Sequence, residues 1–373
     1  MERLYWNNDW KFAETWEEAM KEAVYPENEM EDVRLPHTCK ELPYHYFDEH
    51  AYQMLCGYRR HFMAPEAWQG KSVELTFEGV AHDAVVYVNG TEVKAHHCGY
   101  TAFSVELAKY LKYGEDNVLA VRVDSRENLN IPPFGYAIDY MTFGGMYREV
   151  YVQVRNKTHL ADVFVKSQIH PLQVTTEITV QNISDGITLQ QEIRKKGEGA
   201  YSPLGKKPVK QANVQTVFPV QEICLWEPEN PHLYEIRTSL WKNGEMIDAR
   251  VDITGFREAG FRKDGFYLNG KKLRLRGLNR HQSYPYVGYA APASMQIFDA
   301  DILKKELGVN AVRTSHYPQS QDFIRRCDEI GLLVFTEFPG WQHIGDEEWK
   351  RQAVQNLKEM IVQYRNHPSL ILW

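Results

Sequence analysis

Hydrophobic and polar positions alternate with a period of two through most of the first 254 residues. In residues 119–124, for example, Leu, Val and Val fall on one side and Ala, Arg and Asp on the other. This alternation is typical of strands with one buried face. The pairs Asn89-Gly90 and Asn243-Gly244 each separate two such segments. They predict tight hairpin turns, because Asn and Gly tolerate positive φ angles.

The strand-rich region is long enough for two domains. Residues 1–156 are predicted to form one β-sandwich. Residues 157–256 have the length, roughly 100 residues, and the strand density of an immunoglobulin-like sandwich. Within the second domain, residues 195–211 are rich in Lys, Gly and Pro and are expected to form an exposed loop.

After Gly255, apolar strands alternate with amphipathic helices, which predicts βα units and a parallel sheet. One helix is expected between a capping Ser320 and Gly331, and another across residues 349–364, where apolar residues recur at helical spacing. The expected strands are residues 272–278, 311–314, 332–335 and 370–373.

Residues 257–373 have room for only these four strands and three helices. A closed (β/α)8 barrel takes roughly 250 residues, so the sequence predicts the first half of a TIM barrel. A half barrel exposes an unpaired parallel edge, which natural proteins avoid. We therefore expect either that the polypeptide continues beyond Trp373 or that another chain completes the barrel. The predicted fold class is multidomain, with two β-sandwiches followed by an α/β half barrel.

Composition narrows the range of partners. The net charge is −7, and Lys and Arg are interspersed with Asp and Glu, so we do not expect nucleic acid as the main partner. No apolar run approaches the roughly 20 residues of a membrane span, and the N-terminus lacks the apolar core of a signal peptide. The five cysteines form no CxxC pair, which suits reduced thiols. We expect a cytoplasmic protein that does not bind membranes.

Polar residues gather where the predicted parallel strands end, the place where barrel enzymes build active sites. Asn279 and His281 follow the first strand, Arg313 and His316 end the second, and Glu337 ends the third. The sequence therefore predicts a site at this edge.

Two segments carry a family resemblance. Residues 310–318 (NAVRTSHYP) and residues 365–373 (RNHPSLILW) resemble the two signatures of glycoside hydrolase family 2, which contains β-galactosidases, β-glucuronidases and β-mannosidases. Residues 226–234 are similar to the family's link through its second domain. The resemblance implies a sugar-binding jelly roll in residues 1–156, an immunoglobulin-like domain in residues 157–256 and the start of the catalytic barrel in residues 257–373.

The resemblance also implies a chemistry. Family members use a retaining double displacement with two glutamates, a general acid/base and a nucleophile. Both would follow Trp373, the general acid/base within a few residues and the nucleophile further on, so no catalytic residue is expected in this chain. His281 and His316 would hydrogen-bond the sugar, and Arg313 would orient the nucleophile. Asp139, followed by the segment 144–148, resembles a loop that reaches from the jelly roll to the sugar site, so Asp139 would contact sugar hydroxyls.

Other residues are less specific. Asn279 and Glu337 could position the residues that contact the sugar without touching the sugar themselves. Glu337 could equally hold a metal or pair with an arginine for structural reasons. The sequence departs from the family at Gln282, where many members have Glu, and at Cys98, where Gly is usual. The run 96–98 (HHC) does not predict a metal site, because successive strand residues point to opposite faces. No cofactor is identified, and a divalent or monovalent cation is left open.

The leading hypothesis is a glycosidase that removes terminal β-linked sugars from a β-glycoside or oligosaccharide. A β-galactosidase type is favoured and a β-glucuronidase type comes next. The sequence does not identify the sugar itself, because the residues that choose it would lie largely beyond Trp373. The alternatives are a non-catalytic carbohydrate-binding protein and one half of a split enzyme. A homo-oligomer or a complementing C-terminal chain remains open as a partner.

Overall fold

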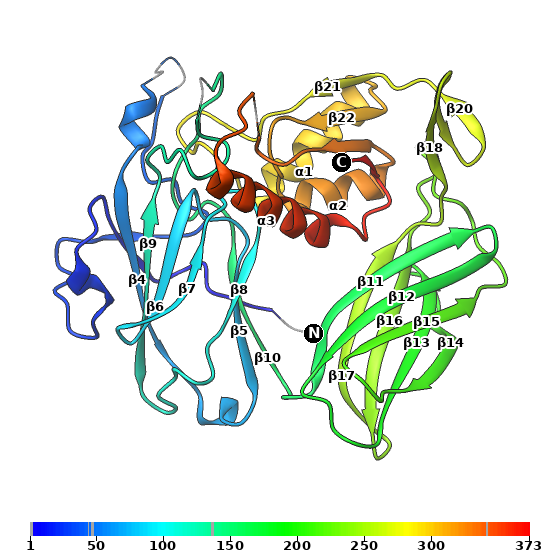
Figure 1. Cartoon of the computed structure of the whole chain (residues 1–373), viewed down its shortest axis with the longest axis horizontal. Coiled ribbons are helices and arrows are strands. Elements are labelled where there is room, and N and C mark those ends of the chain that lie inside the picture. Colours follow the sequence, from blue (N-terminus) through cyan, green and yellow to red (C-terminus); the bar gives the residue numbers. More distant parts are fainter. Residues whose placement is uncertain (1–2, 44, 46–47, 136–137, 341) are drawn as a thin grey trace.

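The computed structural model describes residues 3–43, 45, 48–135, 138–340 and 342–373. Figure 1 shows two β-sandwiches side by side, with an α/β unit above the second sandwich and beside the upper part of the first, and helix α3 running along the lower side of the α/β unit. We call these parts the first sandwich, the second sandwich and the half barrel. None of the helices in the described ranges is long and apolar enough to cross a membrane.

The first sandwich contains a six-stranded and a four-stranded antiparallel sheet. The φ angles of Asn89 and Gly90 are +49° and +84°, which confirms the predicted hairpin turn between β6 and β7. Leu119, Val121 and Val123 pack together in the core of the sandwich, as the alternation in residues 119–124 predicted. On the opposite face, Arg122 and Asp124 are partly exposed, but Ala120 is also buried, in a separate small cluster. The six-stranded sheet consists, in order, of β3 (Glu31–Val33), β2 (Trp10–Ala13), β4 (Leu55–Met63), β9 (Asp116–Asp124), β6 (Asp83–Val88) and β7 (Thr91–His96). The other sheet consists of β1 (Leu4–Tyr5), β10 (Val150–Arg155), β5 (Ser72–Phe77) and β8 (Phe103–Glu106), and three short 3-10 helices are η1 (Glu18–Lys21), η2 (Glu49–Tyr52) and η3 (Glu66–Trp68).

The second sandwich packs a three-stranded sheet against a four-stranded one. The hairpin predicted at Asn243-Gly244 is confirmed, with φ angles of +52° and +86°. The loop predicted for residues 195–211 is wrong in part, because residues 202–208 form strand β14. This strand lies at the sheet edge, where Lys and Pro are tolerated and protect against edge pairing, so its composition resembles that of a loop. The strands are β11 (His159–Ile169), β12 (Leu172–Gln181) and β15 (Asn213–Pro219) in one sheet, and β14 (Ser202–Pro208), β13 (Ile187–Lys195), β16 (Tyr234–Lys242) and β17 (Glu245–Thr254) in the other.

The half barrel contains four parallel strands in sequence order. The predicted strand 272–278 is divided by the structure, because residues 271–273 pair with an antiparallel hairpin and only residues 277–279 enter the parallel sheet. Its apolar pattern runs across the break, so periodicity could not locate it. The parallel strands are β21 (Gly277–Asn279), β22 (Ala311–Thr314), β23 (Leu333–Thr336) and β24 (Leu370–Leu372). The preceding hairpin sheet consists of β18 (Ala259–Arg262), β19 (Gly265–Leu268) and β20 (Lys271–Leu273).

The helices follow their predicted caps. In α2 (Gln321–Ile330), the Ser320 hydroxyl accepts a hydrogen bond from the Asp322 amide at 3.2 Å, and Gly331 ends the helix at φ +71°. Both caps are confirmed. The other helices are α1 (Ala293–Asp301), which continues as the π-helical turn η4 (Ile302–Glu306), and α3 (Glu347–Tyr364).

Helix α3 attaches the half barrel to the first sandwich. The Trp349 indole donates to the Phe134 carbonyl at 3.1 Å. One turn from the end of the helix, Glu359 accepts hydrogen bonds from Thr101 at 2.7 Å and from His96 at 3.1 Å. Burial alone would raise the pKa of Glu359, but His96, Gln355 and Thr101 outweigh it and lower the pKa to about 2.

We expect Glu359→Gln to destabilise the chain at neutral pH by roughly 2 kcal/mol, after allowance for the partial exposure of the carboxylate. The folded pKa lies below the ordinary value of 4.5, so ionised Glu359 stabilises the fold above about pH 4.5. That stabilisation is lost as the pH falls from 4.5 toward 2. The difference in melting temperature between parent and variant should therefore be largest above about pH 5 and become smaller as the pH falls to 3. Glu347→Gln, on an exposed part of the same helix, is the control; a constant offset at every pH would contradict the prediction.

Candidate active site

The carboxyl ends of β22 and β23 bring three of the predicted site residues into one cluster. Glu337 accepts a hydrogen bond from the Arg313 guanidinium at 2.8 Å through Oε2. Its other oxygen, Oε1, lies 3.0 Å from Nδ1 of His316. These contacts arise because β22 and β23 pair in parallel, with Thr314 opposite Thr336, so their following residues emerge at the same edge. Of the roles considered for Glu337, the structure shows the pairing with an arginine, within the candidate site itself.

His281 extends this cluster from the end of β21. Its ring centroid lies 5.4 Å from that of His316, and its Nδ1 lies 3.1 Å from the Tyr317 hydroxyl. Burial and then the electrostatic interaction with His316 lower the pKa of His281, while Asp139 opposes the shift. His281 is therefore neutral at pH 7, and a neutral imidazole can donate one hydrogen bond and accept another. That property suits contact with a sugar hydroxyl.

Asp139 and Asn279 lie at the rim of the cluster. Asp139 is exposed on a loop of the first sandwich, and its charge acts on His281. Asn279 is exposed in β21, opposite Arg313 in the strand register. Within the described ranges, neither side chain is hydrogen-bonded to Arg313 or Glu337. The structure thus joins four of the six predicted site residues directly and places the other two beside them.

Sequence reasoning missed the aromatic wall behind the histidines. The Tyr140 ring centroid lies 5.3 Å from that of His281 and 5.8 Å from that of His316. Tyr317 packs against Tyr140 and stacks on Tyr100 at 4.5 Å. The only hint in the sequence that these tyrosines belong to the site was their position, because Tyr140 follows Asp139 and Tyr317 follows His316. Tyr140 comes from the first sandwich, so this domain shapes a site that is otherwise built by the barrel.

The two departures from the family pattern differ in place. Gln282 lies beside the candidate site, because its backbone amide donates to the Tyr317 hydroxyl at 3.4 Å, the same hydroxyl that His281 contacts. Gln282 is fully buried, and its carbonyl oxygen accepts a hydrogen bond from Arg148 of the first sandwich at 3.1 Å. Gln282 is thus a contact between the first sandwich and the half barrel. Cys98 is also fully buried, and burial raises the pKa of its thiol to about 11, which makes it unreactive at neutral pH.

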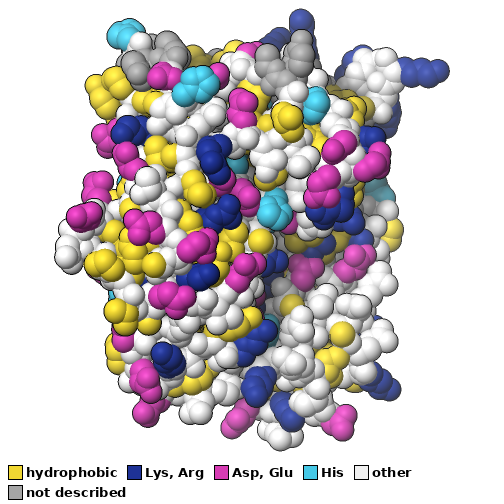
Figure 2. Space-filling view, turned by 60° about the vertical axis from the view of Figure 1, so that its left-hand side comes forward, with side chains coloured by type: hydrophobic (Ala, Val, Ile, Leu, Met, Phe, Trp, Pro, Cys, Tyr) yellow, Lys and Arg dark blue, Asp and Glu magenta, His cyan; other side chains and the backbone are white. Residues whose placement is uncertain are grey.

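No group of three or more His, Cys, Asp or Glu side chains in the described ranges could hold a metal ion. The neighbouring histidines of the first sandwich have separate partners. His97 lies 2.7 Å from Asp83, whereas His96 faces Glu359 of α3. On the face seen in Figure 2, basic and acidic side chains are interspersed, and no basic stripe is visible.

The fold and the site together define a class of proteins with a β-sandwich, an immunoglobulin-like sandwich and a partial TIM barrel that carries a polar cluster at its strand ends. Three family models match in this order. They are "Glycosyl hydrolases family 2, sugar binding domain" over residues 30–155, "Glycosyl hydrolases family 2" over residues 158–257 and "Glycosyl hydrolases family 2, TIM barrel domain" over residues 260–373. The chain belongs to glycosyl hydrolase family 2. This confirms both the family resemblance and the predicted fold class.

Similar proteins agree with this assignment. A beta-galactosidase of Thermoanaerobacter pseudethanolicus is 46% identical over 99% of this chain and 51% of its own length. A beta-galactosidase of Thermoanaerobacterium thermosulfurigenes is 44% identical over 98% of the chain and 52% of its own length. The crystal structure of a Bacteroides uniformis beta-glucuronidase, 29% identical, superposes with a TM-score of 0.91 over 99% of this chain and 46% of that chain. The chain thus spans about half the length of these relatives.

Proposed function

We propose that this chain forms the sugar-binding and first barrel part of a retaining β-glycosidase of β-galactosidase type. The observation that supports this most is the joining of Arg313, His316 and Glu337 at the barrel edge. The two relatives described as beta-galactosidases, at 46% and 44% identity, favour galactose over glucuronate. A purely carbohydrate-binding role is not favoured, because a binding module has no need for this cluster at the strand ends.

The proposed chemistry divides between this chain and the barrel strands beyond Trp373. Double displacement needs two carboxyl groups about 5 Å apart, one attacking the anomeric carbon and one protonating the leaving oxygen. Glu337 is already engaged by Arg313 and His316, which suits an orienting role better than attack. His281 and His316 would hydrogen-bond the sugar, and the free donors of Arg313 would orient the nucleophile. Asp139 would contact sugar hydroxyls from the first sandwich.

The open side of the half barrel supports the proposal that further barrel strands complete it. A cavity of about 210 Å³ lies over the open face of β21 to β24, lined mostly by apolar residues. Burying exposed apolar surface stabilises by about 25 cal/mol per Å². A C-terminal half, in the same polypeptide or in a complementing chain, would cover this surface. The large hydrophobic side chains exposed there are Phe261, Leu275, Leu278 and Leu372.

The proposal predicts no turnover of an aryl β-galactoside by the homogeneous 373-residue chain, and turnover once the barrel is completed. Proton NMR should show the β-anomer of galactose as the first product. In the completed enzyme, His316→Ala should lower kcat/KM by roughly 100-fold, because hydroxyl contacts strengthen in the transition state. His61→Ala, which removes a half-exposed histidine of the first sandwich paired with Asp116, is the matched control.

Three outcomes would count against the proposal. Appreciable turnover by the chain alone would show that the catalytic pair lies within it. Failure of the completed barrel to hydrolyse either an aryl β-galactoside or an aryl β-glucuronide would overturn the glycosidase assignment. Hydrolysis of the glucuronide alone would overturn only the choice of sugar.

We also propose a cytoplasmic location. All five cysteines carry free thiols and four of them are buried, which suits a reducing compartment.

A further inference from the structure

The second family signature begins in a segment that faces the second sandwich, at the opposite end of β24 from the candidate site. The side chain of Asn366 makes three hydrogen bonds to this domain. Its oxygen accepts from the Val165 amide at 2.9 Å, and its nitrogen donates to the Val163 carbonyl at 2.9 Å and to Asp252 at 3.2 Å. The amide group of Asn366 therefore pairs with β11 much as the backbone of a neighbouring strand would.

The residues on either side of Asn366 are fixed as well. Arg365 forms an ion pair with Asp162 in β11. His367 lies 2.5 Å from the buried carboxylate of Asp328 in α2, and the other oxygen of Asp328 accepts from the Ser369 amide at 3.0 Å. These bonds hold both the side chains and the backbone at the start of β24.

A further residue reaches the same segment from the linker between the second sandwich and the half barrel. The Arg257 guanidinium donates to the Pro368 carbonyl at 2.6 Å and to the Leu370 carbonyl. Leu370 is the first residue of β24. Strand β24 has only three residues and pairs with β23 alone in the described sheet, so its own ladder gives it little support.

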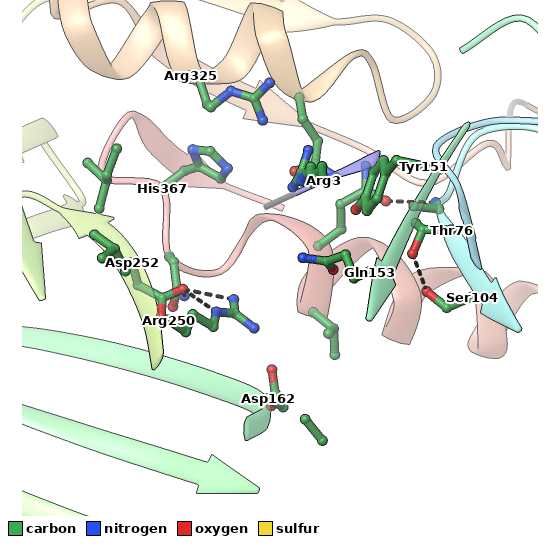
Figure 3. A pocket seen from close by; sticks show the side chains of 18 of the residues that line it. Arg3, Thr76, Ser104, Tyr151, Gln153, Asp162, Arg250, Asp252, Arg325 and His367 are labelled. Carbon is green, nitrogen blue, oxygen red and sulfur yellow. Dashed lines mark hydrogen bonds and ion pairs between the residues drawn. The ribbon is translucent and has the colours of Figure 1, made fainter. Parts of the chain in front are cut away.

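These contacts cross the edge of a deep cleft. A cavity of about 810 Å³ opens where the two sandwiches and the half barrel meet, with Asp162, Asp252 and His367 on its wall (Figure 3). The gap separates much of the second sandwich from helix α3. The bonds around Asn366 are therefore a direct polar connection between the second sandwich and β24, beside the apolar cluster in which Ile371 of β24 packs near Trp226.

We propose that Asn366 is a positioning residue through which the second sandwich fixes the place of β24 in the barrel. The catalytic part of this inference rests on the proposed function, in which the general acid/base follows β24 by a few residues. Such a carboxyl must be placed to within a fraction of an ångström, so a short strand that carries it needs an external anchor. The immunoglobulin-like domain supplies that anchor, and its role is to position the catalytic acid/base.

The first test is amide hydrogen exchange on the folded chain. Asn366→Ala should speed exchange in the β24 peptide and at Val165 at least 10-fold, because the Val165 amide loses its acceptor and β24 its anchor. Exchange in β22 and in the first sandwich should stay within twofold. The matched control is Asn310→Ala, whose side chain bridges the Arg276 amide at 2.7 Å and the Arg274 carbonyl at 2.9 Å within the half barrel. It should loosen β21 and leave β24 and Val165 unchanged.

Swapping the side-chain amide of Asn366 with the carboxylate of Asp252 tests the bond between these two residues without deleting a side chain. Asn366→Asp places a carboxylate against Asp252, and β24 should exchange faster. Adding Asp252→Asn restores the donor and acceptor pair between these two residues with the groups reversed, but not the bond to the Val163 carbonyl, and should recover part of the lost protection. This double variant tests the proposal even if Asn366→Ala fails to fold.

The effect of Asn366 on catalysis is measured separately, by steady-state kinetics. In the completed enzyme, Asn366→Ala should lower kcat about 10-fold and leave KM within twofold, since the sugar contacts of His281 and His316 are untouched. Unchanged exchange in β24, or a uniform increase across all domains, would overturn the positioning role. If the completed barrel proves inactive, the proposed function fails while the exchange results still decide whether β24 is anchored.

Discussion

Arg148→Met is expected to destabilise the chain by about 3–5 kcal/mol, because it removes a buried guanidinium and leaves its acceptors unpaired. Arg148 donates to the carbonyls of Tyr100 and Pro318, each at 3.0 Å, and to that of Glu78 at 3.3 Å. A fourth bond reaches the side-chain oxygen of Gln282 at 3.1 Å. Two of these acceptors belong to the first sandwich and two to the half barrel. The substitution should therefore also weaken the attachment between these two parts.

Denaturant unfolding followed by tryptophan fluorescence would measure the loss. Arg148→Lys should recover little of it, because a single ammonium cannot reach four acceptors that a planar guanidinium spans. The control is Arg126→Met in the same domain, where an exposed ion pair with Asp124 should contribute less than about 1 kcal/mol. Equal midpoints for the Arg148 and Arg126 variants would contradict the interpretation of Arg148 as a buried connector.

Local chemistry explains which parts of the fold could be predicted from the sequence. The Asn89-Gly90 turn and the caps at Ser320 and Gly331 depend on backbone angles and on hydrogen bonds to near neighbours, and all three are found. The edge strand β14 depends instead on pairing with β13, and its Lys and Pro content conceals that pairing. The break between β20 and β21 is likewise set by which distant strand each segment pairs with, β19 or β22.

The same distinction applies to the site. Arg313, His316 and Glu337 could be grouped in advance because parallel strands deliver their ends to one edge. Tyr140 could not be placed there, since it arrives from another domain and its packing on His281 depends on how the domains dock. Asn366 shows the same limit, because its signature indicated a family but not that its side chain bonds the second sandwich.

Trp226→Ala should destabilise the chain by about 3–5 kcal/mol through the cavity that it leaves. Trp226 is fully buried and belongs to a cluster with Phe266 of the hairpin sheet and Leu333 of β23, so it joins the second sandwich to the half barrel. Its indole nitrogen also donates to the Asp328 carbonyl at 2.9 Å. Because the carboxylate of Asp328 holds His367, losing Trp226 should also loosen the start of β24.

Two further variants separate packing from hydrogen bonding at this position. Trp226→Phe retains most of the apolar volume and loses the indole donor, so it should cost only about 1–2 kcal/mol. Trp241→Ala, at a partly exposed position near the β16–β17 hairpin, is the control for removing an indole from the same sandwich. If Trp226→Ala were no more destabilising than Trp241→Ala in thermal unfolding, Trp226 would not be the connection between these domains. If Trp226→Phe were as destabilising as Trp226→Ala, the hydrogen bond to Asp328 would account for the contribution of Trp226 to stability. The second sandwich would then support β24 through that hydrogen bond.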